Sequence, residues 1–220
     1  KKVEGPSEFA RIILNEGRIK DGDTILGLGS GYGIDEVYFV ENLNCTVVAT
    51  DFSDVAVAYF KELESQQNFK GTFKAQFLDL RNAFTFEDGS FSTVYAHQSL
   101  LYFLTDEEMG NIIKEIYRVL TPNGNVSISV RSINDYKYTA SQNAKDHVAT
   151  SNRGIARRFF DEATLKRLFK NAGFQNISIQ ETRIHRYKGG NISTVLYVYA
   201  EKNEAGSSAI VSIPEYEARL

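Results

Sequence analysis

A glycine-rich segment near the N-terminus has the clearest potential to bind a ligand. Residues 27–33 read Gly-Leu-Gly-Ser-Gly-Tyr-Gly. Glycine lets a backbone turn sharply and approach a ligand without side-chain collisions. The segment lacks the Gly-Lys-Ser/Thr of a phosphate-binding P-loop, and it fails the dinucleotide fingerprint Gly-x-Gly-x-x-Gly because Ile34 and Tyr32 stand where glycine is needed. The pattern present is Gly-x-Gly-x-Gly, from Gly29 through Gly31 to Gly33, so a nicotinamide-dependent oxidoreductase is the less favoured of the nucleotide-binding alternatives.

Acidic residues follow the next two apolar runs of the chain. Asp51 closes the run of residues 46–50, where its carboxylate can accept both hydroxyls of a ribose. The alternative is that Asp51 only caps the next turn. Phe52 either lies along a nucleoside base or packs in the core. Asp79, at the end of a third run, either takes the amino group of an adenine or is a turn residue.

Candidate catalytic and acceptor-binding residues lie further along the chain. His97 ends a fourth apolar run and is the candidate catalytic residue, with a hydrogen-bonded structural role as the alternative. Tyr102 either lines the site or packs in the core. The polar, irregular segment 131–160 is the expected substrate lid, in which Tyr136 and Arg153 are candidates to contact an anionic or aromatic acceptor, against a solvated surface role. The three histidines show no metal-ligand spacing, and we expect no metal.

The elements that must position these residues alternate between β-rich and amphipathic runs. Strands are expected at residues 24–28, 46–50, 73–78, 91–96 and 125–130, and helices at 32–43, 53–66, 105–120 and 161–172. Two final strands, 175–181 and 193–200, lie only a loop apart and are expected to pair antiparallel. The pattern predicts an α/β fold with a doubly wound, Rossmann-like, seven-stranded, mostly parallel sheet and a closing antiparallel hairpin. Such sheets bind ligands at the carboxyl ends of their strands.

Several of these segments together resemble a known family. The runs ILGLGSGYG, VVATDFS, FLDL and YRVLTPNGNVSISV, with the closing RFFDEATLKRLFKNAGFQNISI, look like the motifs of class I S-adenosylmethionine-dependent methyltransferases. The resemblance extends from about Pro6 to Lys202, and the subgroup that it most resembles is the small-molecule methyltransferases of the tellurite-resistance type. It implies S-adenosyl-L-methionine as cofactor and S-adenosyl-L-homocysteine as product. The cofactor-binding residues that it implies are Gly27, Gly29, Ser30, Gly31, Gly33, Asp51, Phe52, Asp79, Leu80, His97 and Gln98.

One position departs from the family pattern. The family usually has an acidic residue two positions before the first glycine of Gly-x-Gly-x-Gly, and here that residue is Gly27. In the family this acid helps to fix the methionine end of the cofactor. The departure motivates the alternative of a non-catalytic domain that binds S-adenosylmethionine without turning it over.

Length and composition set the remaining expectations. A chain of 220 residues with 42% hydrophobic and 24% charged residues fits one globular domain, placed at residues 1–202, with 203–220 as a C-terminal tail in which residues 209–213 form a possible strand. A net charge of −3 and the lack of an Asn/Asp-Pro-Pro-aromatic motif after the fourth strand argue against nucleic acid as substrate. One cysteine and no long apolar run favour a cytoplasmic protein without a membrane span. The sequence therefore predicts methyl transfer to an oxygen, nitrogen or sulfur of a small molecule, and it leaves the oligomeric state open.

Overall fold

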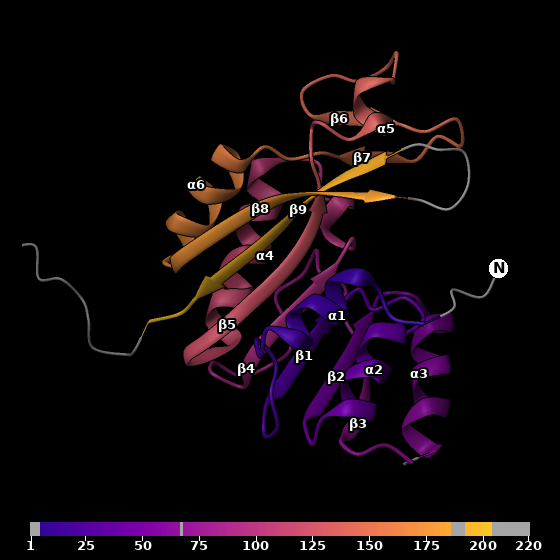
Figure 1. The fold of residues 1–220 in the computed structure, drawn as a ribbon, viewed down its shortest axis with the longest axis vertical. Coiled ribbons are helices and arrows are strands. Elements are labelled where there is room, and N and C mark those ends of the chain that lie inside the picture. The colour runs from indigo at the N-terminus through magenta and orange to yellow at the C-terminus, as the bar shows by residue number, and fades with distance from the viewer. Residues whose placement is uncertain (1–4, 67, 186–191, 204–220) are drawn as a thin grey trace, which may run out of the picture.

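Seven strands form one sheet in the order β3-β2-β1-β4-β5-β9-β8, with helices on both faces (Figure 1). The structure is a computed structural model that describes residues 5–66, 68–185 and 192–203. The strands of the sheet are β1 (Thr24–Leu28), β2 (Thr46–Asp51), β3 (Thr72–Phe77), β4 (Phe91–His97), β5 (Leu120–Arg131), β8 (Gln175–His185) and β9 (Ile192–Glu201). The α-helices are α1 (Glu8–Asn15), α2 (Ile34–Asn42), α3 (Asp54–Gln66), α4 (Asp106–Val119), α5 (Tyr136–Thr139) and α6 (Glu162–Ala172), and a short 3-10 helix, η1, covers Leu100–Tyr102.

The pairing of the strands confirms the predicted fold class. β1 pairs in parallel with β2 on one side and with β4 on the other, and β2–β3 and β4–β5 are parallel too. β9 pairs antiparallel with both β5 and β8, which makes the closing hairpin. Because the chain order reverses between β1 and β4, the carboxyl ends of these two strands form the switch point at which such sheets bind ligands.

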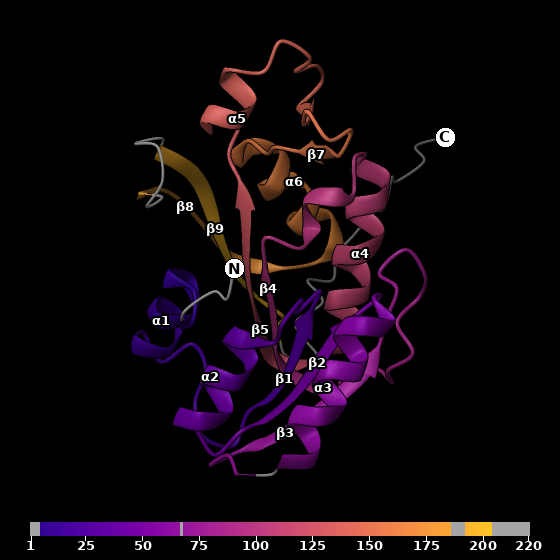
Figure 2. The same cartoon turned by 90° about the vertical axis from the view of Figure 1, so that its right-hand side faces the viewer.

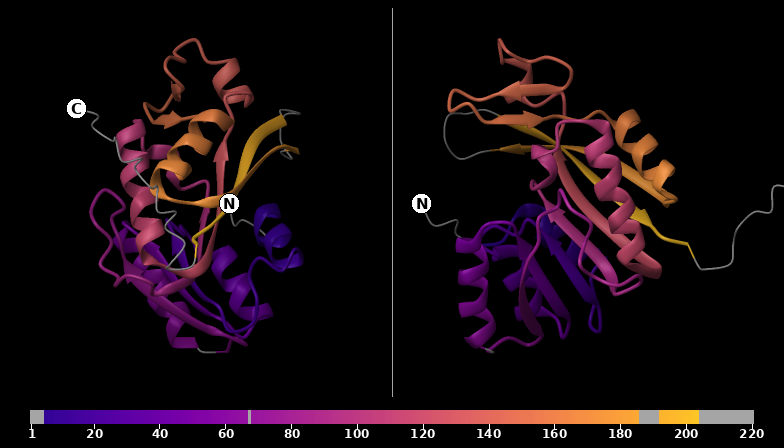
Figure 3. Two further views of the ribbon diagram at one scale, coloured as in Figure 1. Left: turned by 90° about the vertical axis from the view of Figure 1, so that its left-hand side faces the viewer. Right: turned by 180° about the vertical axis from the view of Figure 1, so that it is seen from behind.

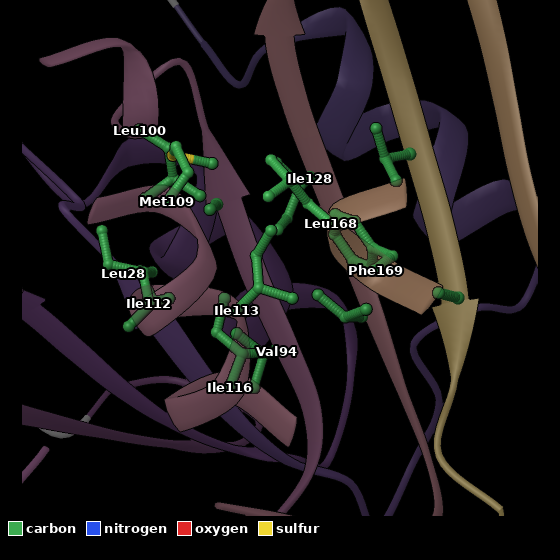
Figure 4. Packing of buried hydrophobic residues seen from close by; sticks show 14 of the residues in the cluster. Leu28, Val94, Leu100, Met109, Ile112, Ile113, Ile116, Ile128, Leu168 and Phe169 are labelled. Carbon is green, nitrogen blue, oxygen red and sulfur yellow. The ribbon is translucent and has the colours of Figure 1, made fainter. Parts of the chain in front are cut away.

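Two apolar cores lie on opposite faces of the sheet. Successive residues of a strand point to opposite faces, so Ile25 packs with α1, α2 and α3 whereas Leu26 packs with α4 and α6. Figure 4 shows the second core, where Ile113 and Ile116 of α4 lie close to Val94 of β4. Helices therefore pack on both faces of β1 and β4, the two strands that carry the site.

The helix signals of the sequence are confirmed where side chains cap the helix. Thr105 and Glu108 form a reciprocal capping box at the start of α4. Asp161 accepts a hydrogen bond from the N–H of Thr164 at the start of α6, and Gly173 ends that helix in the left-handed conformation.

Several boundaries differ from the expected ones; β8, for example, extends to His185 rather than ending at residue 181. α2 begins at Ile34 rather than at residue 32, because Gly31 and Gly33 have φ values of 60° and 65°, outside the helical region. The Pro122-Asn123-Gly124 break lies inside β5 rather than before it: Phe91 pairs with Leu120 and Thr93 with Asn125, so the extra residues are accommodated as an irregularity of the strand. α1 was not predicted as an element.

The lid segment is more ordered than its composition indicated. It forms α5 and a two-stranded sheet of β6 (Val148–Thr150) and β7 (Ala156–Arg158) beyond the carboxyl end of β5 (Figure 2). Ser132 and Phe160 form a β-bridge, so the two ends of the lid segment lie side by side where it leaves the sheet. Two ion-pair groups hold it: Arg131 contacts the fully buried Asp135 at 2.9 Å, and Arg158 of β7 shares the carboxylate of Asp106 on α4 with Arg167 of α6.

Figure 3 shows α4 and α6 side by side on one face of the sheet. Within the described residues, no helix has the length and apolar character needed to cross a bilayer. The strand expected at residues 209–213 lies outside the described residues, and the boundary at residue 202 stays a prediction.

Candidate functional site

The glycine loop joins β1 to α2 at the switch point of the sheet. The N–H of Ser30 donates to the carbonyl of Thr50, at 2.8 Å, which binds the loop to the end of β2. Gly31 has a φ of 60°, and a Cβ placed there would meet no atom within 4 Å. The loop therefore presents bare backbone to open space at this position, as expected of a loop that cradles a ligand.

Asp51 connects the loop to the next turn. Its carboxylate accepts the N–H of Gly31 on Oδ2 and the N–H of Ser53 on Oδ1, both at 3.0 Å. The turn-capping role and the loop-binding role are thus combined in one side chain. Each oxygen of a carboxylate can accept more than one hydrogen bond, so Asp51 can also accept hydrogen bonds from a ligand.

A cleft of about 590 Å³ opens above Asp51 at the carboxyl ends of the strands. Phe52 lines it and is 65% exposed, so this ring does not pack in the core. Asp79 lines it too and is paired with Arg81, whose Nη2 lies 2.6 Å from Oδ2; the guanidinium lowers the pKa of the carboxyl. The residues that line the cleft are Gly29, Gly31, Asp51, Phe52, Leu78, Asp79, Leu80, Arg81, His97, Gln98, Ser99, Tyr102, Phe103 and Glu108.

A second cavity of about 460 Å³ adjoins this cleft, since Gly29 and His97 line both. Ser7, Ser30, Tyr32, Asp35, Glu36 and Tyr95 are among its other residues. The carboxylate of Asp35 accepts hydrogen bonds from Tyr95 Oη at 2.6 Å, Ser7 Oγ at 2.8 Å and the Ser7 N–H at 2.7 Å. Burial beside this carboxylate raises the pKa of Tyr95, and burial together with Asp35 raises the pKa of Glu36 to about 8.

His97 and Gln98 lie where the cleft and the cavity meet the end of β4. The ring of His97 stacks on that of Phe9 from α1, with centroids 5.9 Å apart. Gln98 has a φ of 56°, which its Nε2 bond to Ser129 Oγ, at 2.8 Å, helps to hold. Among the described residues the buried Oε1 of Gln98 has no hydrogen-bond partner, and Gln98 is one of the residues that line the cleft.

The three predicted acceptor-binding residues are not brought together. Tyr102 lines the cleft and is 54% exposed, so it does not pack in the core. Tyr136 and Arg153 line a separate cavity of about 570 Å³ within the lid. A cation–π contact connects the two places, because the guanidinium of Arg157 in the lid cavity lies 5.8 Å from the ring centroid of Tyr102.

In the part of the chain that the structure describes, no three His, Cys, Asp or Glu side chains gather in a way that could hold a metal ion.

Comparison with known proteins finds a methyltransferase domain in the part of the chain that carries the site. Residues 25–124, which carry the glycine loop, Asp51, Asp79 and His97, match the methyltransferase domain family. A S-adenosylmethionine-dependent methyltransferase from Methanosarcina mazei superimposes with a TM-score of 0.72 at 19% identity, over 87% of this chain and 98% of that one. Residues 25–124 thus match a methyltransferase domain, and the chain has the fold of an S-adenosylmethionine-dependent methyltransferase.

Some of the similar proteins have names that state a substrate. Phosphoethanolamine N-methyltransferase from Triticum aestivum is 24% identical over 182 residues, which are 81% of this chain and 32% of the relative. Phosphoethanolamine N-methyltransferase 1 from Zea mays is 24% identical over 83% of this chain and 34% of its own length. The chain thus spans about a third of these curated relatives. Phosphoethanolamine N-methyltransferase 2 from Haemonchus contortus, in complex with S-adenosyl-L-methionine, has a TM-score of 0.66 at 16% identity, over 89% of this chain and 52% of that one. The tellurite-resistance subgroup stays a prediction.

The residues of this cleft fit S-adenosylmethionine, the cofactor that the resemblance implies. The open space at Gly31, the Asp51 carboxylate and Gln98 all lie at one cleft. The exposed ring of Phe52 lies on the same cleft and is free of the core, which suits a residue that covers a purine.

Other residues of the site were missed from the sequence. Arg81, Ser99 and Glu108 line the cleft, and Ser7, Asp35, Glu36 and Tyr95 line the adjoining cavity. The signal for Asp35 and Glu36 was available, since both stand in the first turn of the helix that follows the glycine loop. Ser7 and Tyr95 carried no such signal, because they meet Asp35 only through tertiary packing.

Proposed function

We propose that this chain transfers a methyl group from S-adenosylmethionine to a heteroatom of a small-molecule acceptor. The observation that carries the proposal is the Asp51 carboxylate, bonded to the N–H of Gly31 and facing a cleft that Phe52 and Asp79 also line. When bound, S-adenosylmethionine supplies a methyl group on a sulfonium, together with its own leaving group.

The residues of the cleft divide by the part of the cofactor that each would hold. Asp51 would accept hydrogen bonds from the ribose hydroxyls, and Phe52 and Leu80 would cover the adenine. Asp79, Arg81 and the Oε1 of Gln98 supply polar contacts at the edge of the cleft. The glycine loop, from Gly27 through Ser30 to Gly33, would pass beneath the methionine part. These contacts fix the position of the reacting atom, which is the main contribution a protein makes to such a displacement.

His97 is our candidate for the group that contacts the acceptor. It lines both the cleft and the adjoining cavity, so a molecule in the cavity lies against its ring. A hydroxyl acceptor must lose its proton as the bond to carbon forms, and a neutral imidazole can take it. A free amine or a thiolate needs no such base.

The lid favours an anionic acceptor. Lys137, Arg153 and Arg157 line its cavity together with Tyr136, and Arg157 contacts Tyr102 at the cleft. Phosphoethanolamine, the substrate in the names of the two plant relatives, carries both a phosphate and an amine. We therefore place it first among the acceptors to test.

Calorimetric titration with S-adenosylhomocysteine, with NADH as the control ligand, tests the cofactor. We expect micromolar or tighter binding of the homocysteine compound alone; NADH binding without it would instead support an oxidoreductase. Incubation with S-adenosylmethionine and phosphoethanolamine then tests turnover through the formation of S-adenosylhomocysteine. Binding without turnover of this or any other small amine, hydroxyl or thiol would support the non-catalytic alternative.

A further inference from the structure

The side chain of Glu36 occupies the space that a side chain at residue 27 would need. A Cβ at Gly27 would lie 2.6 Å from Oε1 of Glu36 and 2.8 Å from Oγ of Ser30, closer than Cβ atoms approach other atoms in proteins. The absence of a side chain on β1 therefore makes the room that the carboxylate from α2 occupies. The family acid is missing at residue 27, and a carboxylate from another element stands against the same place.

At the buried position of Glu36, an ionised carboxylate needs a cation as partner. Glu36 is 3% exposed and lines the cavity that adjoins the cofactor cleft at Gly29. None of the ion pairs formed by the described residues includes it. A buried charge without a partner is unfavourable, so the group is neutral until a cation arrives.

The neighbouring groups do not supply that cation. Asp35 on the same helix has its carboxylate occupied by three donors, from Tyr95 and Ser7. Asp51 from β2 adds a second negative charge, Tyr95 from β4 is a neutral phenol whose pKa is raised, and His97 from β4 lines the same cavity. The electrostatic environment of Glu36 thus favours binding of a positively charged group.

We infer that Glu36 replaces the missing acid of β1 and binds the ammonium group of the cofactor's methionine part. The inference rests on the proposed function, because it assigns one more residue of the same site. It also explains how Gly27 is compatible with cofactor binding. Since Glu36 is protonated in the free protein at neutral pH, binding of the ammonium ion expels that proton to solvent, and the complex carries a carboxylate–ammonium pair.

Binding of two different ligands tests this inference separately from the proposed function. S-adenosylhomocysteine carries the ammonium group, whereas 5′-methylthioadenosine has the same adenosine and sulfur without it. In calorimetry on the unmodified protein at pH 7, in two buffers of different ionisation enthalpy, we expect S-adenosylhomocysteine to release about one proton and methylthioadenosine to release none. No proton release with S-adenosylhomocysteine would overturn the inference while leaving the proposed function in place. If neither ligand binds, the proposed function fails first.

Variants test the residue itself. Glu36→Gln resembles the protonated side chain in size and hydrogen bonding, so we expect it to fold, to bind S-adenosylhomocysteine about tenfold to hundredfold more weakly, and to bind methylthioadenosine as before. Glu41→Gln, exposed on the same helix, is the matched control and should change neither affinity. The double variant Gly27→Asp with Glu36→Ala removes the Glu36 atoms that a side chain at residue 27 would meet, restores an acid at the family position and should regain affinity for S-adenosylhomocysteine relative to Glu36→Ala alone. Equal losses for both ligands in Glu36→Gln would indicate a structural role only.

Discussion

The N–H of Gly31 donates to the carboxylate of Asp51 at 3.0 Å, so the glycine loop and the end of β2 form one unit. Loss of this carboxylate would remove both the proposed hydrogen bonds to a ribose and the support of the loop. We predict that Asp51→Ala weakens S-adenosylhomocysteine binding by ~1–3 kcal/mol, because charge-assisted bonds are lost. Calorimetry checks this, with Asp54→Ala, exposed at the start of α3, as control. Unchanged affinity in Asp51→Ala would show that the ribose lies elsewhere.

Substitution at Gly31 tests where the ligand passes the loop. A Cβ at this residue meets no protein atom within 4 Å but points into open space at the cleft, and its φ of 60° is costly for any other residue. We predict that Gly31→Val blocks cofactor binding and costs about 1–2 kcal/mol of stability from the backbone alone. Thermal unfolding measures the second effect and titration the first. Full binding in a folded Gly31→Val variant would contradict the assignment of the loop.

Substitution of Phe52 distinguishes stacking on a ligand from packing in the core. Because its side chain is 65% exposed, Phe52→Ala should leave the melting temperature nearly unchanged. We predict that the same change lowers affinity for S-adenosylhomocysteine by ~1–3 kcal/mol, the range for an aromatic ring stacked on a base. Phe52→Tyr should bind as the unmodified protein does. A large loss of stability in Phe52→Ala would be the contrary result.

Glu36 makes the stability of the unliganded protein depend on pH. Its pKa is about 8 in the folded state against an ordinary value of 4.5, because of burial and the nearby Asp35. Between these values the folded state holds a proton that the unfolded chain releases, so stability falls as pH rises, by up to about 1.4 kcal/mol per pH unit. Chemical denaturation from pH 5 to pH 8 should show a contribution of this sign that Glu36→Gln removes and Glu41→Gln keeps. Identical pH profiles for the two variants would refute it.

The lid is attached through Asp106, whose carboxylate binds Arg158 and Arg167. Arg158 is only 5% exposed, so loss of its carboxylate leaves a buried charge unpaired. We predict that Asp106→Asn increases amide hydrogen exchange in residues 148–160 while affinity for S-adenosylhomocysteine is retained. Exchange followed by mass spectrometry measures this, with Glu107→Gln, the exposed neighbour, as reference. Protection equal to that of the unmodified protein would show that the lid is held elsewhere.

Local sequence patterns were sufficient to predict most of the helices and strands. β1 was predicted at its observed bounds, Thr24–Leu28, because an apolar run ends there in glycines. α4 was predicted from its capping box and its apolar periodicity, both of which act within a few residues. β5 was placed too late, because its pairing with β4 tolerates a Pro-Asn-Gly insertion that local rules interpret as a stop.

The site was predictable only where chain order determines position. Asp51, Asp79 and His97 end parallel strands, so topology alone brings them to one edge, and all three line the cleft. Tyr136 and Arg153 lie in the lid, whose path depends on contacts such as Arg158 with Asp106. Glu36 stands in the first turn of the helix after the glycine loop, but its contact with Gly27 was not predicted, because that contact arises from tertiary packing.

The bridge between Ser132 and Phe160 affects how the set of acceptors that such a protein methylates could change. The two ends of the lid are as close as neighbouring strands, so the intervening chain can be lengthened, shortened or exchanged at a small entropic cost. The cofactor cleft, built from β1, β2, β3 and β4, would not be altered by such an exchange. Under the proposed function, the molecule therefore combines a fixed part that binds the cofactor with an exchangeable segment that contacts the acceptor, joined at one place in the sheet.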